Sequence, residues 1–310
     1  MKNHTLHQLI EDHPQVPFFL KPSWMEVVCP GEWDLIAQEK DGKLQAFIPF
    51  RLRNKWGYRI VTTPYLTPHS GPWIAEGMDP KLKTEAYKAI AKKISEYSYL
   101  NLKLEAAEDY FFAWSSSRVK MSLIPTFILK TNSISEYEKG ISKRKLQKIR
   151  ELRNKLKLSP FDTNDLIKAL KSSYAHQGSK LPFAEKLIHE VVDFICLYNH
   201  GEVLGIKDND GSPISGILYV EDNCSYYSLL RGQNYDCSNL PGLLFLQDMI
   251  NQKAVISNQK MDFCGSQNKG IAMWNSQFGP TVNYFLSIRK PIQNYFSELS
   301  KTLLTRFKTN

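Results

Sequence analysis

At 310 residues, with 42% hydrophobic and 12% aromatic side chains, the chain is suited to two domains with packed cores, which excludes wholesale disorder. Its five cysteines are scattered, odd in number and form no CxxC pair, which argues against a disulfide framework or a zinc ribbon. The formal charge of +9 is local, because residues 143–157 hold eight basic side chains against Glu151 and contribute +7, which leaves +2 elsewhere.

We expect no targeting segment at the start of the sequence. Residues 1–20 contain Glu11, Asp12 and two prolines but no continuous apolar stretch, so a signal peptide is not expected. No apolar run approaches the roughly 18 residues of a membrane span. We therefore expect a protein without a membrane span in a reduced, cytoplasmic setting.

The first half predicts a three-stranded start to a sheet. Residues 33–40 and 44–50 flank Asp41-Gly42, a dipeptide typical of hairpin turns, and residues 58–62 supply a third strand. Pro80 begins an amphipathic helix with apolar residues at i+4 spacing, and residues 125–129 predict a further strand.

The second half repeats this order of elements. We expect a long helix capped by Ser135 and running to Leu156, helices over 163–176 and 182–198, and further helices from Pro241 and Pro291. A second hairpin turns at Asp210-Gly211, between strands 201–206 and 214–220, and residues 225–230 form the next strand. The repeat indicates a duplication, although hairpins of this type are common.

Helices and hairpins mix without a run of alternating βαβ units, which predicts an α+β fold. We place the boundary near residues 125–135. The expected domains are residues 1–130 and residues 131–310, the second beginning with a basic helix over 135–157.

Several catalytic signatures are absent from the sequence. There is no GxxxxGK[ST], GxGxxG, HExxH or GxSxG motif, so nucleotide hydrolysis, Rossmann cofactors, zincin chemistry and the hydrolase elbow have no support. The seven histidines do not cluster at ligand spacing, so no metal site is expected.

The segment after residue 225 could bind an anion. A strand ends at Arg231, a polar loop follows as far as Asn239, and Gly242 stands at the start of a helix. A helix N-terminus presents unpaired N–H groups and the positive end of the dipole, which favours phosphate or carboxylate. The alternative is that every strand-to-helix junction does this and that Gly242 only permits a tight turn.

A second candidate region begins at Asp262. An apolar strand ends there, and Ser266 follows among small residues where a substrate could approach the backbone. Equally, Asp262 could accept local backbone bonds and Ser266 could cap the next helix.

Two further segments have open interpretations. Lys143 and Arg144 begin the basic segment, which could hold phosphates of a donor or acceptor, bind nucleic acid, or only form a solvated helix face. Tyr65, His69 and Trp73 lie in a proline-rich block and could line a pocket wall or pack as a surface loop.

Several blocks together resemble the FemAB-related group, which includes proteins labelled GNAT-type acetyltransferases. They are the basic stretch from Ser142 to Arg150, the strand, loop and helix from Tyr226, the Asp262-Phe263-Cys264-Gly265-Ser266 block, the helix from Gly270 to Gly279, and the Pro- and Gly-rich block from Thr63 to Trp73. The order and spacing of the blocks carry the resemblance, which runs from about Trp33 to Ile288.

The resemblance implies two tandem GNAT-like domains, each with a mixed, mainly antiparallel sheet flanked by helices. It also implies transfer of an acyl or aminoacyl group from acyl-CoA or aminoacyl-tRNA, as a co-substrate and not a tightly bound cofactor, to an amine of a small molecule or cell-envelope precursor. In this bacterial-type group the motif around Trp274 often has lysine where this chain has Asn275, and the Gln/Arg-x-x-Gly-x-Gly/Ala donor loop is not intact after Arg231.

The residue roles follow from this resemblance. Asp262 or Tyr227 would act as base, and Trp274 with Ser266 would line the substrate pocket. N–H groups near Gly242, with Arg231 or Asn275, would stabilise the oxyanion or hold phosphates. Donor phosphates would bind at Arg231, Asn239, Gly242, Lys143 and Arg144. The alternative is a catalytically inactive GNAT-fold protein that binds nucleic acid, tRNA included, or a phosphorylated envelope precursor through its basic helix.

Overall fold

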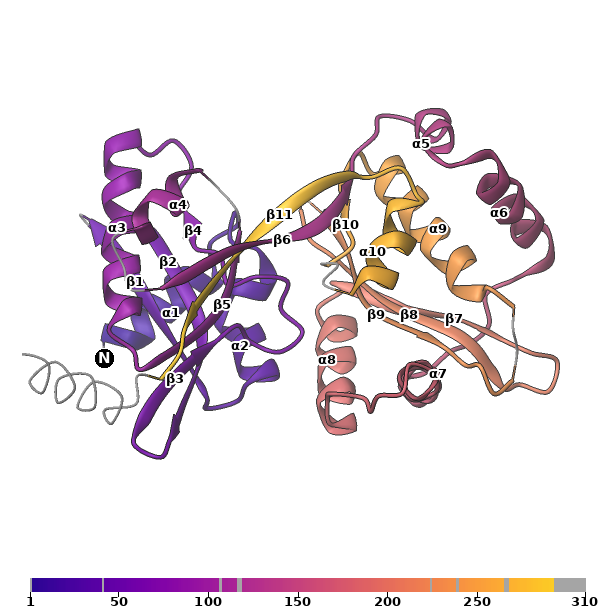
Figure 1. Ribbon diagram of the computed structural model, residues 1–310, viewed down its shortest axis with the longest axis horizontal. Helices are drawn as coiled ribbons and strands as arrows, with labels where there is room; N and C mark the ends of the chain where they lie inside the picture. The colour runs from indigo at the N-terminus through magenta and orange to yellow at the C-terminus, as the bar shows by residue number, and fades with distance from the viewer. Residues whose placement is uncertain are drawn as a thin grey trace, which may run out of the picture.

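The computed structural model of the chain describes residues 2–40, 42–105, 108–115, 119–223, 225–237, 240–264 and 268–292, which form two lobes joined by long strands (Figure 1). The N-terminal lobe contains α1 Lys2–Glu11, the 3₁₀ helix η1 Phe18–Leu20, α2 Pro22–Val28, β1 Trp33–Lys40, β2 Lys43–Lys55, β3 Tyr58–Thr62, β4 Trp73–Ile74, α3 Pro80–Ser95, β5 Tyr99–Glu105, α4 Glu108–Ser115 and the start of β6 Lys120–Leu129. The C-terminal lobe contains α5 Ile134–Gly140, α6 Lys143–Lys155, α7 Thr163–His176, α8 Glu185–Leu197, β7 Gly201–Lys207, β8 Pro213–Glu221, β9 Ser225–Gln233, α9 Gly242–Ile256, β10 Lys260–Asp262 and α10 Lys269–Ser276, after which β11 Thr281–Lys290 returns to the N-terminal lobe.

The strands in these ranges form one mixed sheet that crosses both lobes. Their order is β1-β2-β3-β5-β11-β6-β10-β9-β8-β7, and β4 pairs with β2 outside this path. Neighbours are antiparallel apart from β3 with β5 and β9 with β10. The predicted α+β class, with a mainly antiparallel sheet flanked by helices, is confirmed.

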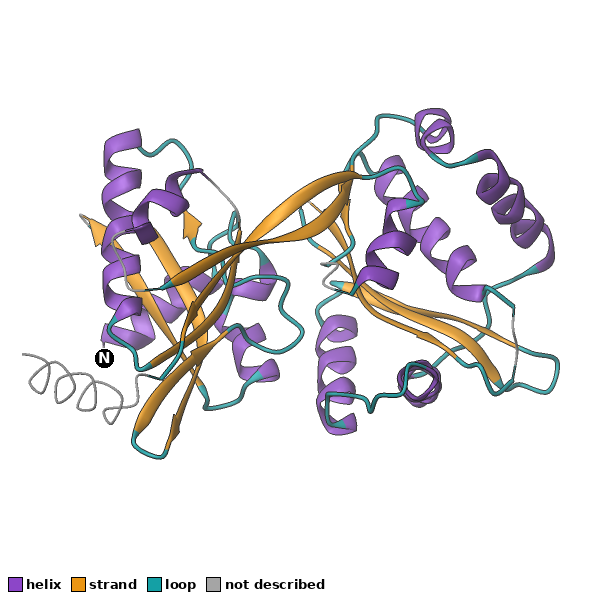
Figure 2. Cartoon of the chain, viewed as in Figure 1, coloured by secondary structure: helices purple, strands orange, loops and turns teal. Residues whose placement is uncertain are grey.

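The last described strand lies in the middle of this sheet. β11 pairs with β5 on one side and with β6 on the other, and together with β6 it spans the gap between the lobes (Figure 2). The N-terminal lobe therefore receives a strand from the far end of the chain. The domain boundary near residue 130 stays a prediction, because backbone pairing continues across it.

One hydrophobic core also joins the lobes. Side chains of α1, η1 and α2 form a single cluster with those of α7, α8 and β9. Within it, the rings of Trp24 and Phe194 lie 5.8 Å apart and those of Phe19 and Tyr227 lie 5.3 Å apart. Both pairs combine a residue from the N-terminal lobe with one from the C-terminal lobe, so burial of these rings holds the lobes together.

Local sequence explains the placement of α7 on the sheet. The capping box between Asp162 and Asp165 fixes its first turn, and the predicted range 163–176 is confirmed. Gly205 and Gly216 face each other on β7 and β8, and a Cβ at either position would lie within 2.5 Å of the Phe161 ring. The glycine pair thus forms a slot that receives Phe161 just before the helix begins.

The prediction of one continuous helix from Ser135 to Leu156 is wrong. The chain forms two helices, α5 and α6, because Ile141 and Ser142 adopt extended backbone between them. Ser133, not Ser135, caps α5. Ile141 is buried in the core of the C-terminal lobe, and this burial favours the break over a continuous amphipathic helix. The helix expected from Pro291 and the residue Asp41 lie outside the described residues.

Candidate functional site

The site is built around the point where two parallel strands separate. β9 and β10 pair as far as Tyr227 and Asp262, after which β10 ends while β9 continues to Gln233. The Asp262 carboxylate accepts the backbone N–H of Cys264 at 2.7 Å, and Cys264 adopts a left-handed φ of 60°. This Asx-type turn leads the chain away from β9 and opens the sheet between the two strands.

A cationic cavity lies on the α9 side of this opening. It has a volume of about 540 Å³ and lies between α6, the N-terminal end of α9 and the C-terminal end of α10. The lining includes Arg144, Lys145, Lys148, Gln233, Tyr235, the residues Leu240, Pro241, Leu243 and Leu244, and Trp274 with Gln277. Three basic side chains and the positive end of the α9 dipole make this cavity suitable for an anion.

Lys145 is the most constrained cation of the cavity. Its Nζ lies 4.4 Å from the centre of the Phe278 ring and 5.4 Å from that of Trp274, and it donates a hydrogen bond of 2.5 Å to Gln277. Burial lowers the pKa of Lys145 to about 8. Among the described residues it has no carboxylate partner, so an anionic ligand would meet an ammonium that is not already neutralised.

Arg231 approaches Trp274 from the sheet. Its guanidinium lies 5.0 Å from the Trp274 ring centre and donates a hydrogen bond of 2.8 Å to the side-chain oxygen of Asn275. Burial lowers the pKa of Arg231 to about 10, and no carboxylate of the described residues forms an ion pair with it. The structure thus brings together the predicted residues Arg231, Trp274 and Asn275, and adds Lys145.

A buried polar network runs from Arg231 toward α6. Gln247 of α9 lies 3.5 Å from Arg231 and donates to Asn251, which donates to the Tyr137 hydroxyl. That hydroxyl in turn donates to Asp248 at 2.9 Å. The chain of contacts therefore links the floor of the site to α5 and α9 through side chains that are almost entirely buried.

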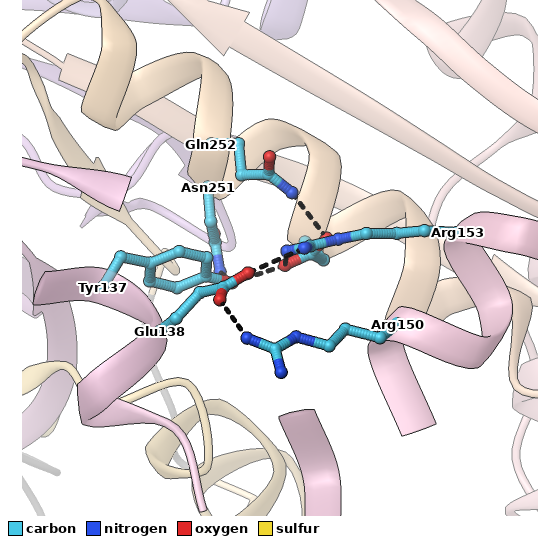
Figure 3. A network of polar contacts seen from close by, with 7 residues as sticks. Tyr137, Glu138, Arg150, Arg153, Asn251 and Gln252 are labelled. Atoms are coloured by element: carbon cyan, nitrogen blue, oxygen red, sulfur yellow. Dashed lines mark hydrogen bonds and ion pairs between the residues drawn. The ribbon is translucent and has the colours of Figure 1, made fainter. Parts of the chain in front are cut away.

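The network ends on the basic helix (Figure 3). Arg153 makes a two-bond contact with Asp248, at 2.9 and 3.0 Å, and also donates to Glu138, which accepts from Arg150 as well. These ion pairs neutralise two of the basic side chains of α6. The charge of the helix is consequently divided between a structural face and the face that lines the cavity.

A second polar cluster lies on the opposite face of the sheet, between the lobes. This interlobe cluster contains His69, Lys103, Asp262 and Cys264. Lys103 on β5 and Asp262 on β10 lie on the same face, because strand register connects them through β11 and β6. The charges of Lys103, Asp262 and Arg231 all act on the Cys264 thiol, which therefore lies where the two faces meet at the β9–β10 opening.

Burial changes the acid-base chemistry of the interlobe cluster. Asp262 is 6% exposed, and burial raises its pKa to about 6. Hydrogen bonds from Cys264 and Thr126 and the charges of nearby lysines oppose this rise, because they favour the ionised carboxylate. Burial lowers the pKa of His69, whose imidazole lies against the rings of Phe19 and Phe285, to about 3. Asp262 is thus a carboxylate that can exchange a proton near neutral pH.

Tyr227 lies beside Asp262 but is engaged elsewhere. Its hydroxyl donates a hydrogen bond of 3.1 Å to Asp222, and burial raises its pKa well above the usual value of 10. A phenol held in this way is protonated at neutral pH, so the geometry favours Asp262 over Tyr227 as the base.

The residues predicted to bind phosphate do not all lie at one place in the structure. Arg144 lines the cationic cavity, whereas Lys143 lies in a different depression with Leu146 and Gln147. The N–H of Gly242 donates to Leu240, and a Cβ at Gly242 would lie 2.4 Å from the Ser215 hydroxyl. Close packing of α9 on β8 therefore accounts for this glycine. Asn239 and Ser266 lie outside the described residues.

The predicted pocket wall of Tyr65, His69 and Trp73 is dispersed. Trp73 is buried against Phe47 and donates its indole N–H to the carbonyl of Gln15. Tyr65 is exposed, with the Arg51 guanidinium 4.2 Å from its ring centre. His69 alone joins the interlobe cluster.

Sequence reasoning missed the individual roles of Lys103 and Lys145. Lys103 alternates with the buried Leu102 and Leu104 along β5, a pattern that usually places a lysine in solvent. Lys145 stood within the basic segment without any feature to separate it from its neighbours. Its distinction depends on α10, which lies more than a hundred residues further along the chain.

The described residues contain no group of three or more His, Cys, Asp or Glu side chains arranged to hold a metal ion. Nor does this part of the chain contain a helix with the length and apolar character needed to cross a bilayer.

Solved structures of FemAB-like and GNAT-related proteins share this fold. FemX matches with a TM-score of 0.67 and 13% identity, over 92% of this chain and 96% of its own. L-PGS from Bacillus licheniformis matches with a TM-score of 0.55 and 13% identity, over 98% and 95%. A GNAT-family acetyltransferase from Colwellia psychrerythraea has a TM-score of 0.50 and 9% identity, over 93% and 97%.

No family model and no curated protein matches the sequence. At such low identities the structural likeness shows the fold alone.

Proposed function

We propose that the protein is an acyl- or aminoacyl-transferase that moves an acyl group from a thioester or an aminoacyl ester to an amine. The observation that carries the proposal is the opening between β9 and β10, with a cationic cavity on one face and a carboxylate of raised pKa on the other. An acyl donor held on one face could present its carbonyl at the opening to an amine that arrives from the other.

The donor would bind on the α9 side. Acyl-CoA carries its phosphates at the far end of the pantetheine arm and aminoacyl-tRNA carries one on its terminal nucleotide, and Arg144, Lys145 and the N-terminal end of α9 offer positive charge to such phosphates. Trp274 would provide an apolar surface beside the phosphates, and Arg231 with Asn275 would donate to the carbonyl oxygen as negative charge develops on it.

The chemical step is direct attack of the amine. The nitrogen forms a bond to the donor carbonyl carbon, the C–S bond of the thioester or the C–O bond of the ester breaks, and no covalent intermediate with the enzyme is needed. The proton lost by the attacking nitrogen passes to the Asp262 carboxylate, and the leaving thiolate or alkoxide takes up a proton. Holding both reactants at the opening would supply much of the acceleration.

The test combines ligand binding with turnover. Acetyl-CoA, longer acyl-CoAs and charged and uncharged tRNA would be screened by thermal shift, since a ligand that binds only the folded state raises its stability. Transfer to a panel of amines would then be followed by release of thiol or of free tRNA. Replacement of both Arg144 and Lys145 by Gln should weaken binding at least about tenfold, because each loses a charge-assisted contact.

The matched control is Lys186→Gln on α8, which removes a highly exposed lysine that forms an ion pair with Glu190. This variant should bind and turn over like the parent. Equal binding by the cavity variant and the control would contradict the assignment of the cavity, and the absence of transfer with every donor would contradict the proposed activity.

A non-enzymatic, basic binding protein is the second candidate. Fewer unpaired basic side chains of α6 are left to bind a nucleic acid than the sequence suggests, since Arg150 and Arg153 form ion pairs with Glu138 and Asp248. Binding of nucleic acid that falls steeply with salt, without any turnover of an acyl donor, would favour this candidate.

A further inference from the structure

Lys103 is an ammonium that the fold places between the lobes without neutralising it. Among the described residues its Nζ has no hydrogen-bond or ion-pair partner, and the nearest aromatic contact is the Phe285 ring, 5.0 Å from Nζ to the ring centre. Burial lowers the pKa of Lys103, against the negative charge of Asp262. An ammonium in such a place costs free energy of folding, which a bound anion would offset.

His69 adds a second donor to the same place. Its Nδ1 accepts the N–H of Gly71 at 3.0 Å, so the proton of the neutral imidazole lies on Nε2. Phe19 and Phe285 contact the ring and fix its orientation. No described residue accepts a hydrogen bond from Nε2, which leaves this N–H available to a ligand.

The opposite charge in the cluster is Asp262. Its carboxylate is close enough to Lys103 for each group to act on the pKa of the other, yet the two side chains form no direct ion pair. His69, Lys103 and Cys264 each keep part of their surface in contact with solvent. The cluster therefore combines a cation and a hydrogen-bond donor with an anion that is not paired to that cation, and the charge of Lys260 also acts on His69 and Asp262. A small ligand that carries both charges would match this pattern.

We propose that the interlobe cluster recognises an acceptor that carries a carboxylate a few bonds away from its amine, as amino acids and short peptides do. The carboxylate binds Lys103 and the Nε2–H of His69, and the amine is held at Asp262, next to the opening between β9 and β10. This inference rests on the proposed acyl transfer for the role of the amine, but the charge pattern of the cluster stands independently of it.

Binding of simple ω-amino acids tests the inference without any acyl donor. Glycine, β-alanine, γ-aminobutyrate and δ-aminovalerate, which place the carboxylate progressively further from the amine, would be titrated calorimetrically alongside their carboxamides. At least one carboxylate should bind about tenfold or more tightly than its amide, because it gains a charge-assisted hydrogen bond. The preferred member of the series would report the spacing between Lys103 and Asp262.

Lys103→Met should abolish the preference for carboxylate over amide and leave the affinity for the amides unchanged. Lys103→Arg should restore part of it. The control is Lys120→Met on β6, which removes an exposed lysine and should alter neither affinity. A thermal melt of Lys103→Met establishes that the variant is folded, and the loss of a buried charge should raise its midpoint.

Equal affinity for carboxylates and amides, or binding of neither, would overturn the inference. So would an equal loss for both in Lys103→Met, which would indicate a purely structural lysine. If the preference is found but no acyl donor is ever turned over, the proposed function fails while this binding site remains.

Discussion

Asp262 combines two demands on one side chain. The sequence predicted that Asp262 lies at a strand end, where it could either accept a backbone hydrogen bond or take part in catalysis. In the structure it accepts a hydrogen bond from the Cys264 N–H, and its pKa is raised to about 6. Above this pH the carboxylate is ionised and ready to accept a proton, and the protein bears the cost of burying that charge.

Asp262→Asn should therefore lower transfer by about a hundredfold or more, as loss of a general base does. It should also stabilise the protein at pH 7.5 by up to about 3 kcal/mol, from a shift of roughly two pKa units. The folded-state pKa lies above the unfolded value, so the cost is present above about pH 6 and disappears as the pH falls toward 3.8. Urea unfolding at several pH values measures the difference.

Asp193→Asn on α8 is the control, because that carboxylate is exposed and outside the site. A less stable Asp262→Asn protein at pH 7.5, or one with full activity, would contradict the role given to this residue. The pKa and the buried partners of Asp262 could not be predicted from the sequence. Thr126 lies on β6, which pairs with β10, and Lys103 lies on β5, which is joined to β6 through β11.

At the scale of elements, the break between α5 and α6 determines what the basic segment can do. A continuous helix from Ser135 to Leu156 was predicted from its apolar face, and local periodicity could not reveal the extended residues Ile141 and Ser142. Because of the break, both Tyr137 of α5 and Arg153 of α6 reach Asp248 of α9. The two helices are thereby fixed around the cavity.

Arg153→Met should destabilise the protein by about 3 kcal/mol, because it leaves a fully buried Asp248 without its cation. Arg150→Met is the matched control. That arginine is 60% exposed and forms its ion pair with Glu138, so its loss should cost about 0.5 kcal/mol or less. Urea denaturation compares the two, and equal costs would contradict a structural role for the Arg153–Asp248 pair. Adding Asp248→Asn to Arg153→Met should recover part of the loss.

At the scale of the whole molecule, the sequence predicted most elements but not how the halves join. The hairpins, the strand after each and the helix over 163–176 follow from alternation, turn residues and caps, all of which act locally. The position of β11 between β5 and β6 does not, because pairing partners far apart in the chain leave no local pattern. The interlobe cluster depends on that same pairing, because β11 and β6 lie between Lys103 of β5 and Asp262 of β10.

The stability of an isolated fragment of residues 1–130 tests the importance of this long-range pairing. It should not fold stably alone, since β5 and β6 would lose the strand between them and α2 would lose its contacts with α8. Joining residues 279–292 to its end through a glycine-rich linker should restore secondary structure and a cooperative thermal transition, measured by circular dichroism. A cooperative transition in the unmodified fragment would instead support an independent N-terminal domain.

The place of β11 also sets an order of events during synthesis. A strand near residue 290 completes a sheet whose neighbouring strand ends at Glu105, so this pairing must wait until almost all the described chain has left the ribosome. The C-terminal lobe can form its helices and its hairpin from local contacts sooner than the N-terminal lobe can close. A nascent chain therefore spends most of its synthesis with β5 and β6 exposed as edges, open to chaperones and to aggregation.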